Sequence, residues 1–366
     1  MGSSRILGCA SQGAGSNDEV RLRLLLQEFE AEFVDFQYHQ KIKSFFECLR
    51  LIRTGRFDLF VLEGSGIAGG LAAIVGRILF RCRYAFSSGD AIAPYLSARW
   101  PLAGPIFNLY ERVLCRCSDG FIGWTPYLVG RSLTLGARRG VTIPGWAPYA
   151  CDPERLREER AKIRRRFHIP DDAVVFGLVG SLRWSKRIRY CYGAELIRAA
   201  GRAARSPYVL IVGDGTGLPF LKSLAGEALD RTIFLPGRIA REEVPYYLAA
   251  MDVGSLPQSL DGVGSFRYTT KISEYRLVSL PFVTNEIPMA YDLDRGDIWR
   301  LPGETPWSER FISSLAQLMQ ELTMAVVVTR KIAPEGSAEF NEPEQIRRAT
   351  AFLQDVLSSF AAPPKT

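Results

Sequence analysis

The sequence is poor in the residues from which histidine metal sites and hydrolytic sites are built. Its only two histidines, His39 and His168, stand in no H-x-x-x-H arrangement. Ser65 lacks the G-x-S-x-G frame of a hydrolase nucleophile, and no G-x-x-x-x-G-K-[ST] loop occurs. These absences argue against a histidine-bound metal, an α/β-type hydrolase and a P-loop nucleotidase. We therefore expect no metal site.

The seven cysteines include no C-x-x-C pair. Cys115 and Cys117 stand two apart, but no second pair completes a zinc site. An odd number of cysteines without a disulfide pattern is typical of a reduced chain, so we expect a cytoplasmic protein.

Long apolar runs are absent as well. Spanning a bilayer takes roughly 18 or more apolar residues, and the nearest candidate, Ile67 to Phe80, is shorter and interrupted by Arg77 and glycines. The N-terminus has no charged region followed by an apolar stretch, so no signal peptide is expected there.

Positive charge is in excess, with a net charge of +7 and a pI of about 9.1. Much of it is arginine, with a cluster from Arg155 to Arg166. A solvated helix or linker face explains this cluster, and so does attraction to an anionic membrane surface. No aromatic-interleaved basic motif or zinc finger is present, so no nucleic-acid partner is expected.

Short apolar segments with strand and helix spacing alternate along the chain, whose 366 residues are enough for two domains. A helix is expected over Val20–Glu30, and a second α/β unit begins with an expected strand at Ala173–Gly180. The expected strands of the first half include Arg5–Ala10, Phe33–Phe36 and Phe57–Leu62. This alternation predicts α/β domains with doubly wound parallel sheets, followed by an amphipathic helix over Glu342–Phe360.

A glycine-rich turn, Gly213-Asp214-Gly215-Thr216-Gly217, follows an expected strand and precedes a helix. It fails the dinucleotide fingerprint G-x-G-x-x-G, because Leu218 occupies the third glycine position. These glycines are therefore most simply read as a tight strand-to-helix turn.

The segment from Thr269 to Val283 reads as a loop, a short helix, a break near Pro281 and a strand. Such a break lies where open α/β sheets build their ligand pockets. Glu274 stands in the first helical turn, near the positive end of the helix dipole, and its carboxylate can accept hydrogen bonds from a vicinal diol such as a ribose.

Taken together, these segments resemble the retaining glycosyltransferases of the GT-B fold, in particular glycosyltransferase family 4. The Thr269–Val283 segment is similar to the family's P-x-K-x-x-E-Y-x-x-x-x-x-P-V-V pattern, and the Gly213 turn to its G-D-G-P-x-x-x-x-L turn. The resemblance implies two Rossmann-like doubly wound domains facing a cleft: an acceptor-binding domain over 1–150 and a nucleotide-sugar-binding domain over 151–340. A C-terminal helix over 341–366 would then cross back to the first domain.

The resemblance also assigns site residues. Lys186 matches the lysine of the family segment G-R-L-x-x-x-K-G, which neutralises the donor diphosphate, while Ser181 replaces its arginine and Arg183 is a substitute cation. Lys186 and Glu274 are the residues on which catalysis is expected to depend. The wider donor site is expected to include Gly213, Lys271 and the Gly237-Arg238-Ile239 loop, whose backbone contacts the nucleobase in relatives.

A second glycine-rich loop holds Asp261, Gly262, Val263 and Gly264, whose backbone N–H groups could approach sugar hydroxyls or phosphate. The family's E-x7-E spacing is absent here. Asp261 either contacts the transferred sugar or shapes the turn, and the sequence favours neither.

In the first domain, the loop with Gly13 and Gly15 resembles the family's glycine loop. No histidine matches the one that many relatives carry near the reaction centre, so Asp90 is the nearest polar candidate there. Leu71–Arg83 and Ala98–Arg116 combine apolar and basic residues. They fit either a peripheral membrane contact, at the inner membrane face, or ordinary core and solvated surface.

The expected reaction is transfer of a hexosyl unit from a UDP- or GDP-sugar to an acceptor hydroxyl, with retention of configuration. The acceptor could be a sugar, a lipid-linked molecule or another small molecule, and no cofactor is expected. Two alternatives remain open: a nucleotide-sugar epimerase on the same fold, and a non-catalytic subunit that binds nucleotide-sugars.

Overall fold

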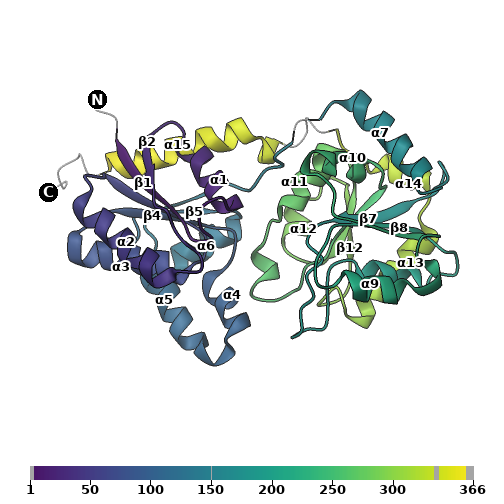
Figure 1. The fold of residues 1–366 in the computed structure, drawn as a ribbon, viewed down its shortest axis with the longest axis horizontal. Coiled ribbons are helices and arrows are strands. Elements are labelled where there is room, and N and C mark those ends of the chain that lie inside the picture. The colour runs from purple at the N-terminus through teal and green to yellow at the C-terminus, as the bar shows by residue number, and fades with distance from the viewer. Residues whose placement is uncertain (1–3, 150, 334–337, 360–366) are drawn as a thin grey trace. The chain divides into compact units, whose positions relative to one another are not determined.

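The structure is a computed structural model that describes residues 4–149, 151–333 and 338–359. The chain forms two compact units, each with its own sheet (Figure 1). One comprises Met1–Gly145, Phe266–Tyr268 and Glu339–Thr366; the other comprises Trp146–Ser265 and Thr269–Ala338.

The first unit is built on a six-stranded parallel sheet with the order β2-β1-β3-β4-β5-β6. Its strands are β1 (Arg5–Ala10), β2 (Glu30–Phe33), β3 (Leu59–Glu63), β4 (Tyr84–Ser88), β5 (Gly120–Gly123) and β6 (Gly140–Thr142). Strands β3 and β4 are buried along their whole length, as expected for central strands covered on both faces.

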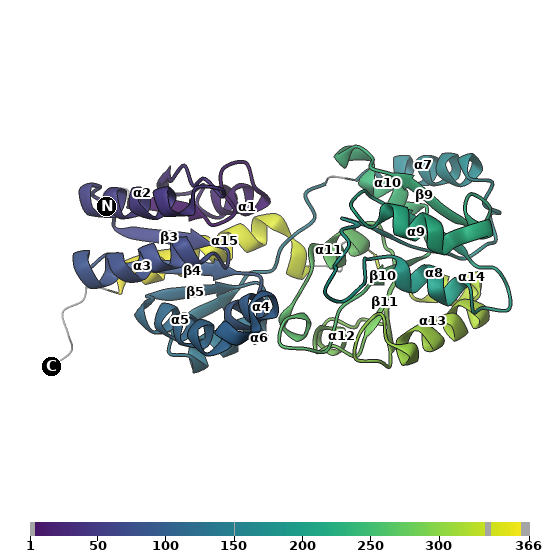
Figure 2. The ribbon, with the colours of Figure 1, turned by 60° about the horizontal axis from the view of Figure 1, so that its bottom comes forward.

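Helices cover both faces of this sheet. They are α1 (Asn17–Leu25), α2 (Lys41–Thr54), α3 (Ile67–Phe80), α4 (Ile92–Arg99), α5 (Gly104–Cys117), α6 (Pro126–Thr134) and α15 (Glu342–Ser358), with a 3₁₀ turn η1 (Pro101–Ala103). Because parallel crossovers are right-handed, the reversal of strand order at β1 places α1 on one face and α2, α3 and α5 on the other. Figure 2 shows α2, α3 and α5 as successive members of one layer.

The C-terminal helix α15 packs on the first unit beside α1, across from the α2–α3–α5 layer. The Arg83 guanidinium donates to the Val356 carbonyl, and Arg139 pairs with Asp355 at 2.6 Å. A side chain in place of Gly120 on β5 would overlap Phe352 and Val356, so helix and sheet are in direct contact. The predicted return of the last helix to the first domain is confirmed.

The second unit has a six-stranded parallel sheet with the order β12-β11-β10-β7-β8-β9. Its strands are β7 (Val175–Val179), β8 (Tyr208–Val212), β9 (Ile233–Gly237), β10 (Val253–Leu256), β11 (Phe282–Asn285) and β12 (Ile298–Leu301). The strand order reverses between β7 and β10, and ligands of open α/β sheets bind at the carboxyl ends of strands at such a point.

The helices of the second unit follow its strands in the usual alternation. They are α7 (Pro153–Arg166), α8 (Ala194–Ala200), α9 (Leu218–Ala225), α10 (Val244–Ala249), α11 (Thr270–Leu277), α12 (Met289–Asp292), α13 (Glu309–Glu321) and α14 (Met324–Thr329), with 3₁₀ turns η2 (Gly226–Ala228), η3 (Arg241–Glu243) and η4 (Gly264–Phe266). Both units are therefore Rossmann-like, as the sequence predicts.

Two arginines of the basic cluster on α7 point into the fold. Asp252, at the start of β10, is fully buried and pairs with Arg164 at 2.9 Å and Arg160 at 2.7 Å. Its carboxylate also accepts a hydrogen bond from the Val175 amide at the start of β7. A buried ion pair needs such additional hydrogen bonds to offset desolvation. Two arginines of the Arg155–Arg166 cluster therefore stabilise the fold. The sequence had suggested only a solvated face or a membrane contact for this cluster.

Some boundaries differ from those expected. Helix α1 begins at Asn17 instead of Val20, because the Ser16 hydroxyl caps it by accepting a hydrogen bond from the Glu19 amide. It ends at Leu25, and β2 then begins at Glu30, earlier than the expected strand at Phe33. Among the described residues, no helix is long and apolar enough to cross a membrane.

Candidate functional site

A cavity of about 360 Å³ opens at the carboxyl edge of the second sheet. It is formed where β7, β8 and β9 end and their following loops begin. Four residues that the sequence assigned to the donor site line it: Ser181, Gly213, Arg238 and Ile239. Its other lining residues are Val179, Gly180, Val212, Asp214, Gly215 and Val244.

The glycines of the turn after β8 are required by a close approach of two loops. Gly213 has φ +142°, and a Cβ there would lie 1.9 Å from the Gly180 carbonyl oxygen. At Gly215, with φ +154°, a Cβ would lie 2.6 Å from the Leu182 backbone. Only glycine fits both the backbone conformation and the contact. The turn after β8 therefore packs directly against the loop after β7, and the two together form one wall of the cavity.

Lys271 and Glu274 lie in the first turns of α11, and both are half-buried. The Lys271 ammonium lies beside Gly180, since a Cβ on that glycine would be 3.0 Å from Nζ. Burial lowers the pKa of Lys271 and raises that of Glu274, while the charge of each opposes the other's shift. Among the residues that the structure describes, neither forms an ion pair or a hydrogen bond through its side chain. Both are thus available to a ligand.

Two further residues, Tyr149 and Arg241, belong to this group and were not found from the sequence. Burial and the charge of Glu274 raise the pKa of Tyr149, and a hydrogen bond with Arg241 opposes that shift. The charge of Arg241 also opposes the rise in the pKa of Glu274 that burial causes. No local motif marks either residue, because they are distant from Glu274 in sequence and meet it only through the fold.

The predicted phosphate ligands Arg183 and Lys186 are exposed on the loop after β7 and do not line the cavity. That loop is held to the glycine turn: the Leu182 amide donates to the Asp214 carbonyl, and the Trp184 amide donates to Thr216 Oγ1. Lys186 lies in the turn between the paired residues Ser185 and Tyr190. The Lys271 ammonium, by contrast, lies beside Gly180, the residue that follows β7.

In the second glycine loop, Asp261 accepts hydrogen bonds from its own segment. Its carboxylate receives the Val263 and Gly264 amides at 2.8 Å and the Ser259 hydroxyl at 2.7 Å. This geometry shapes the turn that carries Gly262, one of the two alternatives that the sequence left open.

At the carboxyl edge of the first sheet, Gly13 and Gly15 follow β1 with φ +98° and +77°. Asp90 follows β4 and forms an ion pair with Arg267. Asp90 belongs to a cluster of carboxyl groups with Asp18 and Glu63, and this cluster was not predicted from the sequence. Glu63, the last residue of β3, is buried 3.6 Å from Arg21 and accepts a hydrogen bond from Trp124. The only sequence signal was a carboxylate at the end of an apolar strand.

Burial dominates the titration of this acidic group. It raises the pKa of Glu63 to about 7, although the Arg21 guanidinium opposes the shift and Asp18 adds to it. The pKa of Asp18 is raised too, first by burial and then by the charge of Asp90. Such clustering of perturbed carboxyl groups is frequent at functional sites.

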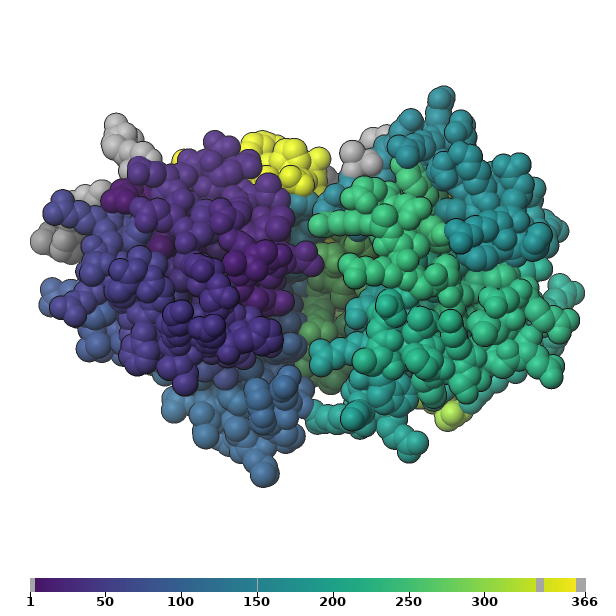
Figure 3. Space-filling model, viewed as in Figure 1, coloured from purple at the N-terminus to yellow at the C-terminus, as the bar shows by residue number. Residues whose placement is uncertain are grey.

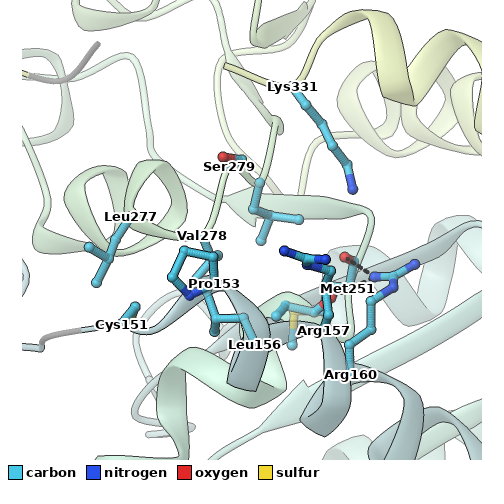
Figure 4. A pocket seen from close by; sticks show the side chains of 12 residues that line it. Cys151, Pro153, Leu156, Arg157, Arg160, Met251, Leu277, Val278, Ser279 and Lys331 are labelled. Carbon is cyan, nitrogen blue, oxygen red and sulfur yellow. Dashed lines mark hydrogen bonds between the residues drawn. The ribbon is translucent and has the colours of Figure 1, made fainter. Parts of the chain in front are cut away.

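A second cavity of about 360 Å³ lies at the opposite, amino edge of the second sheet, before β10 and β11 (Figure 4). Arg160 donates to the Met251 carbonyl there, while the Arg157 and Lys331 side chains extend toward the same space. None of the predicted site residues lines this cavity. Among the described residues, no group of three or more histidine, cysteine, aspartate or glutamate side chains could hold a metal ion.

Solved structures similar to this chain over nearly its whole length include Anabaena HepE in complex with UDP and glucose. The two chains share 16% identity with a TM-score of 0.66, covering 96% of this chain and 100% of HepE. The chain has the GT-B fold.

Two other solved structures with this fold are also similar. Sucrose-phosphate synthase from Thermosynechococcus elongatus matches with a TM-score of 0.71 and 12% identity, over 97% of this chain and 100% of that one. The lipopolysaccharide outer core galactosyltransferase WaaB matches with a TM-score of 0.60 and 12% identity, over 97% and 99% of the two chains. Comparison with protein-family models and with curated proteins gave no match.

Proposed function

We propose that the protein is a retaining glycosyltransferase that moves a hexosyl unit from a nucleotide-sugar to an acceptor hydroxyl. The observation that carries the proposal is the cavity at the carboxyl edge of the second sheet. It combines a glycine turn, the Ser181 and Arg238 segments, and the neighbouring Lys271 and Glu274 of α11. The GT-B fold, and the UDP and glucose held by HepE, support a UDP-sugar as the first donor to test, with GDP-sugars as the comparison.

In this proposal Glu274 accepts hydrogen bonds from the ribose hydroxyls. Its carboxylate is half-buried and has no hydrogen-bond partner among the described residues, so a diol could use both oxygens. The backbone of Arg238 and Ile239, which lines the cavity, contacts the nucleobase.

Cationic side chains would neutralise the leaving diphosphate without a metal. Arg238 lines the cavity, and the Lys271 ammonium lies beside Gly180 in its wall. Lys186 and Arg183 lie on the neighbouring loop, from which they would reach the phosphates in the donor complex. A preorganised cation lowers the barrier because negative charge develops on the diphosphate as the glycosidic bond breaks.

Retention requires that the acceptor hydroxyl attack the same face of the sugar from which the diphosphate leaves. We propose that no protein carboxylate forms a glycosyl adduct and that Asp90 positions the acceptor. A product of inverted configuration, or a trapped adduct on Asp90, would overturn this mechanism.

The test is calorimetric titration of UDP and GDP into the wild type and Glu274→Gln, followed by a donor-turnover assay. Loss of the carboxylate should weaken UDP binding by about 1.5–3 kcal/mol, the range of hydrogen bonds to a charged group. Glu227→Gln, an exposed change on η2, is the matched control. Equal UDP affinity in all three proteins would remove Glu274 from the site.

One observation favours a second candidate, a non-catalytic nucleotide-sugar-binding subunit. Ser181 stands where relatives carry an arginine, and it lines the cavity without supplying a charge. A protein that binds UDP yet neither hydrolyses nor transfers any UDP- or GDP-sugar would support this candidate.

A further inference from the structure

In the first unit, the outward sides of α3 and α5 carry several exposed apolar side chains. Helix α3 is the clearest case: Ile78 and Leu79 are 65% and 66% exposed, and Leu71 is exposed on the same side. The only charged residue of α3, Arg77, turns inward to Asp119 at 3.2 Å. An amphipathic helix normally places polar residues on its outer side, and α3 does not.

The segment that joins α4 to α5 extends this apolar surface to a tip. Leu102, in η1, is 100% exposed, and Trp100 before it is exposed as well. On α5, Ile106 and Leu109 are 68% and 62% exposed. Figure 3 shows α4 to α5, in blue, projecting from the rest of the first unit.

These side chains lie on one set of neighbouring helices, because α3 packs against α5 and α5 against α4. We call this set of side chains the outer helical face and define it as Leu71, Ile78, Leu79, Trp100, Leu102, Ile106 and Leu109. Single exposed apolar residues are ordinary, but a run of them over adjacent helices marks an interaction site.

The charged residues around the outer helical face indicate which kind of partner it binds. From residue 64 to residue 117, the acidic residues are Asp90 and Glu111. Glu111 is buried against Arg131, and Asp90 pairs with Arg267. The exposed charges of this stretch are arginines: Arg81, Arg99, Arg112 and Arg116. Two copies of this chain joined through such a face would bring like charges together, whereas an anionic lipid surface would pair with them.

We propose that the outer helical face binds an anionic bilayer, with the Leu102 tip inserted at the level of the headgroups and the arginines contacting lipid phosphates. Apolar side chains with Trp100 and a basic rim are the combination that lies stably in a membrane interface. Bilayer binding of this kind needs no transmembrane segment and does not depend on the proposed transferase activity.

The tip would also place a lipid-linked acceptor, and this part of the inference rests on the proposed function. Helix α4 follows the carboxyl end of β4, and the tip connects α4 to α5. The inserted segment is therefore continuous with the sheet edge where Asp90 lies. An acceptor carried by a lipid would be held near that edge.

The experiment is vesicle flotation of the full chain at low and moderate salt. Vesicles of phosphatidylcholine alone are compared with vesicles that also contain phosphatidylglycerol. The wild type should float with the anionic vesicles, and the floating fraction should fall as the salt concentration rises. In the presence of neutral vesicles the protein should remain unbound and should not float. A wild type that never floats overturns the proposal.

Variants then locate the surface. Leu102→Asp/Ile106→Asp should reduce binding to anionic vesicles by about tenfold or more, since burying one leucine contributes about that factor. Arg112→Glu/Arg116→Glu should reduce the salt-dependent part of the binding, while Arg81 and Arg99 remain. Val20→Asp, an exposed apolar position on α1 across the sheet, is the matched control and should bind like the wild type.

Two control measurements test the folding and the oligomeric state of each variant. Unchanged thermal unfolding and UDP affinity in each variant show that the fold and the second unit are intact, so loss of flotation reports the face alone. Light scattering gives the oligomeric state. If the Leu102→Asp/Ile106→Asp variant floats like the wild type, or if it splits a wild-type dimer, the bilayer proposal is wrong.

Discussion

At the scale of single residues, the candidate site depends on two half-buried charges that form no ion pair or side-chain hydrogen bond with the described residues. Lys271 and Glu274 shift each other's pKa without forming an ion pair. An ammonium beside Gly180 and a carboxylate one helical turn on suit a ligand with phosphate at one end and a diol at the other. This arrangement is the one that the proposed nucleotide site requires.

Lys271→Ala should weaken UDP binding by about 1.5–3 kcal/mol, because a charged hydrogen bond to phosphate is lost. Uridine, which has no phosphate, should bind the variant and the wild type alike. Isothermal titration with both ligands measures the difference. Equal losses for UDP and uridine would mean that Lys271 supports the cavity instead of contacting phosphate.

Glu63 should make stability depend on pH. Its pKa is about 7 in the folded protein, against an ordinary value of 4.5 for a glutamate, so the folded state binds the extra proton between these two pH values. Stability should therefore fall as pH rises from about 4.5 to 7, by up to roughly 3 kcal/mol for this shift, and remain lower above pH 7. Glu63→Gln should flatten this slope in urea unfolding at several pH values. The exposed change Glu28→Gln should leave it as in the wild type.

At the scale of elements, two contacts hold the second sheet's carboxyl edge and its first helix in place. The glycine turn after β8 packs against the loop after β7, and Asp252 joins α7 to the starts of β7 and β10. The cavity is thus shaped by backbone contacts between neighbouring strand ends. Its walls should be sensitive to the loss of a single glycine.

Gly213→Ala should destabilise the protein by about 1–3 kcal/mol and weaken UDP binding, because the new Cβ would overlap the Gly180 carbonyl at a φ that side chains rarely adopt. Gly130→Ala is the control: Gly130 lies inside α6 with open space around it, so alanine should stabilise by about 0.5–1 kcal/mol. Denaturant unfolding measures both. A Gly213→Ala protein as stable as the wild type would show that the turn relaxes freely.

At the scale of the whole molecule, the C-terminal helix belongs to the first unit although the second unit lies between them in sequence. The buried side chains of α15, among them Ala349, Leu353 and Val356, complete the cover of the first sheet. Each unit has its own apolar core. Damage to α15 should therefore act on one unit only.

Leu353→Ala should cost about 2–5 kcal/mol of stability, the usual range for a leucine removed from a core. Hydrogen exchange should rise in β5, α1 and α15 and remain unchanged in β7 and β8. Leu315→Ala on α13, also fully buried, is the reciprocal variant in the second unit. Uniform loss of protection across both sheets would show that the two units unfold together.

The sequence by itself determined the alternation of strands and helices, the two Rossmann-like sheets and the amphipathic last helix. These follow from local spacing of apolar residues and from turn chemistry at glycines. The resemblance to GT-B glycosyltransferases also assigned Ser181, Gly213, Arg238 and Ile239 to one donor site, and in the structure these four residues line one cavity.

Only the tertiary structure decided which polar groups meet. It brought Tyr149 and Arg241 to Glu274, turned Arg160 and Arg164 inward onto Asp252, and buried Glu63 beside Arg21. It also left the outer side of α3 exposed. The spacing of apolar residues in the sequence could not distinguish these exposed side chains from buried ones. The reason is that pairing and burial depend on strand order and helix packing, and these are set by contacts distant in sequence.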